Sequence, residues 1–168
     1  MFGILLLKAR CAMRIRSTLG TRAACAIAAV VTLVLGASGV AQAASYETDY
    51  AITGSSAQCT YDTQYPGGLG SVCFQKYGDV WMVTRSVLET GNTSVQWANQ
   101  LLNASGSWAT YREGQCINAL GHSTFGVCNK DYYENSSRNA LGGYGSRLRF
   151  RACSTTCSAW TPWFTNNQ

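Results

Sequence analysis

Apolar and basic side chains alternate strictly between positions 147 and 152. Leu148, Phe150 and Ala152 fall on one face of an extended chain, because successive side chains of a strand point to opposite sides. The other face carries three basic residues, which are Arg147, Arg149 and Arg151. This pattern predicts a half-buried strand. Because residues 158–160 follow soon after it, we expect a tight hairpin between the two segments.

A second region of strand-forming residues surrounds two tryptophans. Residues 80–87 are rich in β-branched and aromatic side chains, and residues 95–99 alternate between the two faces of a strand. A turn signal at residues 89–92 separates them, which predicts one hairpin. We expect Trp81 and Trp97 to lie in the core.

The remaining segments are shorter and more polar. A strand is expected at 107–112, ended by Glu113-Gly114, and a second hairpin is expected from 116–118 and 125–128. Two segments are expected to be irregular, namely the polar lead-in at 44–58 and the glycine-rich loop at 142–145. No long stretch after residue 43 shows a convincing helical period. The chain therefore predicts an all-β fold, a small antiparallel β-sandwich or barrel stabilised by disulfides.

The first 43 residues resemble a secretory signal. Basic residues are followed by an apolar run over 23–40 and by Ala41-Gln42-Ala43, so cleavage is expected after Ala43. Met13 opens a normal signal sequence and is an alternative start. The rival interpretation is a membrane anchor, but the small residues that end the run and the cleavage pattern favour cleavage. A single secreted β domain over 44–168 is expected to remain, without membrane attachment.

The net charge of +5 belongs to this leader. From residue 44 onward the chain has eight basic and eight acidic residues, so its formal charge is zero. Nucleic acid binding through bulk charge is therefore not expected, because that binding depends on neutralising phosphates.

Six cysteines remain after the leader, an even number that is typical of a disulfide framework in a small secreted domain. They are Cys59, Cys73, Cys116, Cys128, Cys153 and Cys157. The fifteen pairings that six cysteines allow are not distinguished by the sequence. Our prediction is the local set 59–73, 116–128 and 153–157, because each pair spans a short segment. The absence of C-x2-C and the single histidine after the leader disfavour a metal site, and no cofactor is expected.

Few residues suggest catalysis. His122 is the one histidine and lies near glycine in a loop, where it could act as a general acid or base. Three acids could in principle supply a glycosidase pair, and these are Glu113, Asp131 and Glu134. No further sequence motif accompanies any of them, so we predict no catalytic residue.

Two other features could carry binding. The arginines 147, 149 and 151 could hold a sulfate, a carboxylate or a polyanion, although a solvated face paired with acids of a neighbouring strand is the expectation we favour. Aromatic residues near the C-terminus, if exposed, would form a contact patch. These are Trp160, Trp163 and Phe164.

Several short strings resemble a loose group of small secreted actinobacterial proteins, of the Streptomyces type, that has no assigned reaction. The strings lie at residues 73–81, 114–118, 128–129, 150–153 and 157–160. They consist mainly of Cys, Trp and Gly positions. The resemblance implies a secreted protein from an actinobacterial host, and it implies no catalytic residue.

The sequence thus predicts a monomeric secreted binding protein, without a catalytic site, for an extracellular protein or a carbohydrate. A small secreted hydrolase using His122 or an acid pair is one alternative. An inhibitor of secreted proteases is another, and it would display a loop held by a disulfide, such as 117–127.

Overall fold

The computed structural model describes residues 44–55, 59–68 and 70–167. The predicted secretory signal lies outside these residues. The described chain forms ten strands, which are β1 (Ser45–Tyr50), β2 (Ile52–Thr53), β3 (Tyr61–Gln64), β4 (Ser71–Gln75), β5 (Val80–Arg85), β6 (Thr93–Asn103), β7 (Trp108–Asn118), β8 (Thr124–Asn129), β9 (Gly142–Cys153) and β10 (Phe164–Thr165). Within the same residues there is no helix that could cross a bilayer.

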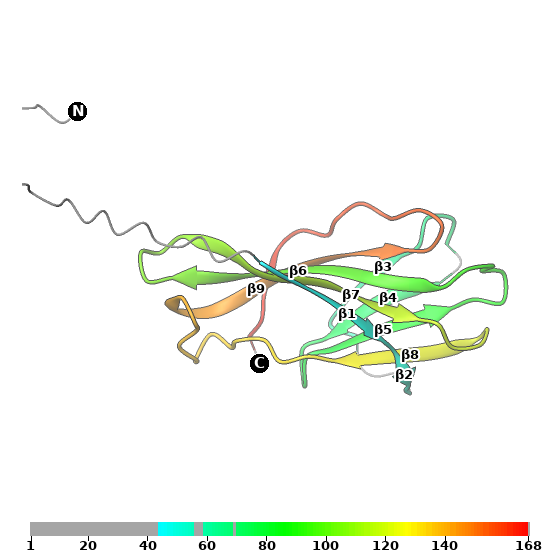
Figure 1. Cartoon of the computed structure of the whole chain (residues 1–168), viewed down its shortest axis with the longest axis horizontal. Helices are drawn as coiled ribbons and strands as arrows, with labels where there is room; N and C mark the ends of the chain where they lie inside the picture. Colours follow the sequence, from blue (N-terminus) through cyan, green and yellow to red (C-terminus); the bar gives the residue numbers. More distant parts are fainter. Residues whose placement is uncertain (1–43, 56–58, 69, 168) are drawn as a thin grey trace, which may run out of the picture. The chain divides into compact units, whose positions relative to one another are not determined.

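The strands form two five-stranded sheets (Figure 1). Sheet A has the order β1-β7-β6-β9-β10, and sheet B has the order β2-β8-β5-β4-β3. All neighbours are antiparallel except β1 and β7, which are parallel. The all-β prediction is therefore confirmed, and the two separate sheets correspond to its sandwich form.

The core lies between the inner faces of the two sheets. Leu148, Phe150 and Ala152 are fully buried, as their alternation with arginine predicts. Trp81 from sheet B and Trp97 from sheet A are also buried, which confirms the prediction for both. The Trp81 ring meets the Phe150 ring edge-on, with centroids 5.1 Å apart, so the sheets are joined by aromatic contacts.

Neither predicted hairpin in the middle of the chain forms. β5 lies in sheet B and β6 in sheet A, and likewise β7 lies in sheet A and β8 in sheet B. Each strand alternates well enough to pair with its neighbour along the chain. However, alternation shows only that a strand has one buried face, and not which strand lies beside it. In the structure the two strands of each pair lie in opposite sheets, and their buried faces cover one another across the core.

Two segments expected to be irregular are strands. The lead-in forms β1 and β2, and the glycine-rich loop forms the start of β9. In β1 the inward positions are Glu47 and Asp49, so the strand has no apolar alternation to reveal it. In β9, Gly142 and Gly145 adopt φ values of 80° and 72°, which an L side chain rarely adopts.

The strand expected to end at Glu113-Gly114 continues to Asn118 as β7. Gly114 does not end the strand but allows close packing within it. A Cβ at this position would lie 2.5 Å from the Glu47 carbonyl oxygen and 2.7 Å from the Trp97 ring. The glycine therefore permits β1 and the core indole to approach β7 from both sides.

All three predicted disulfides are present, and they join Cys59 to Cys73, Cys116 to Cys128 and Cys153 to Cys157. The middle bridge connects β7 of sheet A to β8 of sheet B and is buried. The last bridge closes the turn that follows β9. Three disulfides in one small domain indicate an extracellular or otherwise oxidising compartment.

Candidate functional site

The C-terminal segment, red in Figure 1, returns antiparallel to β9, as the predicted tight hairpin requires. The Ser158 amide donates to the Ala152 carbonyl at 2.8 Å, and the Thr161 amide donates to the Phe150 carbonyl at 2.8 Å. Phe164 then turns into the sandwich, where it stacks on Tyr61 with centroids 4.0 Å apart. The segment thereby closes one edge of the sandwich.

The two tryptophans of this segment interleave with the arginines on the outer face of β9. Trp163 lies between two guanidinium groups, 4.8 Å from that of Arg147 and 4.7 Å from that of Arg149. Trp160 lies 4.8 Å from Arg149 and 4.8 Å from Arg151. Trp108 of β7 adds a further contact, 4.5 Å from Arg147. Cation–π contacts of this kind stabilise the outer face by about 0.5–1 kcal/mol each.

Hydrogen bonds hold the outer two arginines in place. Arg147 donates from Nε and Nη2 to Gln100 Oε1, at 2.9 and 2.6 Å. Arg151 makes the same pair of bonds to Gln96 Oε1, at 2.9 and 2.7 Å. Both glutamines lie on β6, directly opposite these arginines in the register.

The favoured expectation, that acids of a neighbouring strand pair with these arginines, is wrong. Among the described residues, the ion pairs join Glu47 and Asp49 to Arg112 and Lys130. β6, the neighbour of β9, carries no acid, so glutamine accepts where a carboxylate was expected. We call the surface formed by Arg147, Arg149, Arg151, Gln96 and Gln100 the arginine face.

The arginine face concentrates positive charge in a domain that is neutral after residue 43. Burial and the neighbouring charge of Arg149 lower the pKa of Arg147. The three arginines are half-buried, and their guanidinium groups carry N–H donors beyond those bonded to glutamine. The glutamine oxygens already accept bonds from arginine, so the face is rich in donors and suits anionic oxygen ligands.

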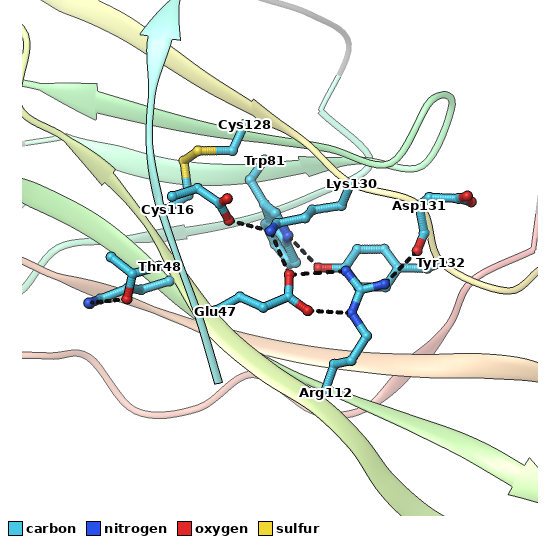
Figure 2. A network of polar contacts seen from close by, with 11 residues as sticks. Glu47, Thr48, Trp81, Arg112, Cys116, Cys128, Lys130, Asp131 and Tyr132 are labelled. Atoms are coloured by element: carbon cyan, nitrogen blue, oxygen red, sulfur yellow. Dashed lines mark hydrogen bonds and ion pairs between the residues drawn. A yellow bond between two sulfur atoms is a disulfide. The ribbon is translucent and has the colours of Figure 1, made fainter. Parts of the chain in front are cut away.

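A second charged cluster lies beside β1 (Figure 2). Glu47 accepts hydrogen bonds from Arg112 Nε at 2.6 Å and from Lys130 Nζ at 2.8 Å, and Asp49 also pairs with Lys130. Burial raises the pKa of Glu47, but the bonds and charges of Lys130 and Arg112 outweigh this and lower it overall. The two acids and two bases balance, so this cluster fastens the edge strand to the sandwich.

A hollow of about 460 Å³ contains two of the acids named as a candidate pair, Asp131 and Glu134. It also contains Asp79, which is 4% exposed. Asp79 accepts from the Tyr132 amide at 2.7 Å and from Asn166 Nδ2 at 3.0 Å, and the same Nδ2 donates to Glu134 Oε1 at 3.0 Å. Burial raises the pKa of Asp79 to about 6, and the charges of Glu134 and Asp131 add to this.

The third candidate acid, Glu113, is not in this hollow. It lies in register with Ala98 on β6, which in turn lies opposite Arg149, so all three share the outer face of sheet A. The structure therefore separates Glu113 from the other two acids. No group of three or more His, Cys, Asp or Glu among the described residues is placed to hold a metal ion.

His122 is exposed in the turn between β7 and β8, and its Nδ1 lies 3.1 Å from the Ser86 carbonyl oxygen. No carboxylate or arginine of the described chain hydrogen-bonds to the imidazole. The same turn lies within the loop considered for protease inhibition. It is fastened to β5, because the Ser123 amide donates to the Arg85 carbonyl at 2.8 Å and Arg85 Nη1 donates to the Leu120 carbonyl at 2.5 Å.

Sequence reasoning found the arginines but missed their partners. Gln96 lies in the predicted strand at 95–99 and Gln100 directly follows it, and near the C-terminus two tryptophans lie three residues apart. That pattern offered a signal, but only strand order reveals that the glutamines and tryptophans flank β9. Comparisons of this chain with protein-family models, with curated proteins and with solved structures find no match.

Proposed function

We propose that this protein is secreted and binds an acidic polysaccharide along the arginine face. One observation carries the proposal. Three arginines stand in a row on one strand, and their ordered partners are amides and indoles instead of carboxylates. The positive charge of the row thus remains available to a ligand.

The row has the geometry of a binding surface for an extended chain. Alternate residues of a strand are about 6.6 Å apart, so the three guanidinium groups extend over about 13 Å. Arg147 and Arg149 each lie against two indole rings and Arg151 lies against one. Arg147 and Arg151 are also bonded to glutamine. Because the side chains are already ordered, a ligand loses little free energy to ordering them.

The covered indoles favour a polysaccharide over a nucleic acid. Single-stranded nucleic acids gain much of their affinity when bases stack on exposed aromatic rings. Trp163 has guanidinium groups close to it on two sides, from Arg147 and Arg149, and Trp160 lies between Arg149 and Arg151. Their rings are therefore occupied. A ligand that needs hydrogen bonds and charge, and no stacking, fits this face best.

Binding to immobilised polymers tests the proposal. The protein purified after signal removal is expected to bind polygalacturonate and dextran sulfate, and to bind uncharged dextran much more weakly. The double variant R147Q/R151Q is expected to lose at least tenfold in affinity for the charged polymers. Arg138→Gln is the control for removing a positive charge elsewhere, because Arg138 is exposed and lies outside the row.

Two results would oppose this function. One is equal binding of the double variant and the unaltered protein, and the other is stronger binding to single-stranded DNA than to either polysaccharide. Release of new reducing ends from the polymer during the same incubation would instead support the hydrolase alternative. We infer secretion itself from the signal pattern and the disulfides, and detection of the cleaved chain in culture medium tests it.

A further inference from the structure

The row of arginine–glutamine pairs on sheet A has a gap at its centre. Arg151 lies opposite Gln96 and Arg147 lies opposite Gln100, and each is bonded to its glutamine. Between them, Arg149 lies opposite Ala98. A methyl group cannot accept a hydrogen bond, so the middle arginine lacks the acceptor that both neighbours have.

The surroundings of Arg149 make this gap costly in the absence of a ligand. Its guanidinium lies between the rings of Trp160 and Trp163, and its Nε is buried without a hydrogen-bond partner among the described residues. The two ring contacts offset part of the lost hydration of the charge, but they give the Nε–H donor no acceptor. The terminal nitrogens of the same guanidinium also have no acceptor among the described residues, and an anion bound there would offset the lost hydration of the charge.

We infer that one carboxylate or sulfate group of the polysaccharide binds at the terminal nitrogens of Arg149, in the middle of the arginine row. This inference rests on the proposed function and assigns the position within the arginine face that holds the acid group. Gln96 and Gln100 lie on either side of Ala98 on the same face of β6. Gln100 Nε2 donates to Thr110 Oγ1 at 3.3 Å, so the Nε2 of Gln96 is the further donor beside this position. Arg147 and Arg151 hold the glutamines and contribute positive charge around the bound group.

Glu113 lies across Ala98 from Arg149 and limits the strength of this site. The two residues are separated by two strand spacings, about 9.6 Å. The structure gives no ion pair between them, so Glu113 does not fill the gap. The negative charge of Glu113 repels an anion bound at Arg149, and removing this charge is expected to strengthen binding about threefold at low salt.

A substitution that gives Arg149 a hydrogen-bond acceptor within the protein tests the inference. Ala98→Gln changes no charge and supplies Arg149 with the acceptor that its neighbours already have. We expect affinity for polygalacturonate to fall at least tenfold. Ser94→Gln is the matched control, because residue 94 lies on the same face of β6 but opposite Cys153, beyond the arginines.

Two further variants keep the test decisive, since Ala98 is only 2% exposed and its replacement can prevent folding. Arg149→Gln is expected to lose as much affinity as R147Q/R151Q, and Glu113→Gln is expected to gain about threefold. If R147Q/R151Q loses binding while the Ala98, Arg149 and Glu113 variants all bind like the unaltered protein, the central position is refuted and the proposed function stands. If the unaltered protein binds neither charged polymer, the proposed function itself fails.

Discussion

Replacing Asp79 with asparagine should stabilise the protein at neutral pH and remove part of its pH dependence. Asp79 is 4% exposed and lies near Glu134, and both carboxylates accept from the single Nδ2 of Asn166. The Oδ1 of Asn166 is buried without a partner. An asparagine at position 79 can still accept from the Tyr132 amide, and its NH2 group can donate to Asn166 once that amide turns over. The half-buried Glu134 then exchanges its bond from Asn166 Nδ2 for a bond from water.

The magnitude follows from the pKa of the carboxyl group. In the folded protein its pKa is raised from 3.8 to about 6, chiefly by burial. Between these pH values the Asp79 carboxyl holds a proton in the folded state that it has released in the unfolded state. The stability that this group contributes is therefore fully present below about pH 4 and is lost as the pH rises through about 6. Each pKa unit corresponds to about 1.4 kcal/mol, which sets an upper limit of about 3 kcal/mol for the loss.

Urea unfolding followed by tryptophan fluorescence, with the disulfides intact, measures this effect between pH 4 and pH 7.5. We expect Asp79→Asn to exceed the unaltered protein by about 2 kcal/mol at pH 7.5, or about 8 °C in Tm, and to match it near pH 4. Asp62→Asn, on the exposed side of β3, is the control for losing one negative charge. A constant difference across this range, or a less stable Asp79 variant at pH 7.5, would refute the reasoning.

Three further changes test the contacts that hold the sandwich together. Glu47→Gln should cost about 1–3 kcal/mol in urea unfolding, because Lys130, whose side chain is 7% exposed, loses a charged partner. Removing the Cys153–Cys157 bridge by two alanine substitutions should cost about 2 kcal/mol, since its loop is short, and a loss above about 4 kcal/mol would contradict this. Asn118→Ala should cost about 2–3 kcal/mol in thermal or urea unfolding, because its buried amide donates to a β5 carbonyl at 2.8 Å.

Local patterns in the sequence were sufficient for the fold class and for the core strand around Phe150. The predicted local set of disulfides is correct, although the sequence did not distinguish it from the other pairings. A period of two is a property of adjacent residues, and a short disulfide loop needs only nearby cysteines. The same local information misled where an inward position is charged. β1 was not predicted as a strand because its inward residues, Glu47 and Asp49, are charged. Their burial is favourable only because Arg112 on β7 and Lys130 after β8 pair with them.

The tertiary structure alone decided which strands are neighbours, and with it the candidate site. The sequence contains the arginines of β9, the glutamines of β6 and the tryptophans near the C-terminus as separate features. Pairing of β6 with β9 places Ala98 opposite Arg149, and the returning C-terminal segment adds the indoles. Strand order depends on which buried faces cover one another across the whole domain, and no local pattern records that balance.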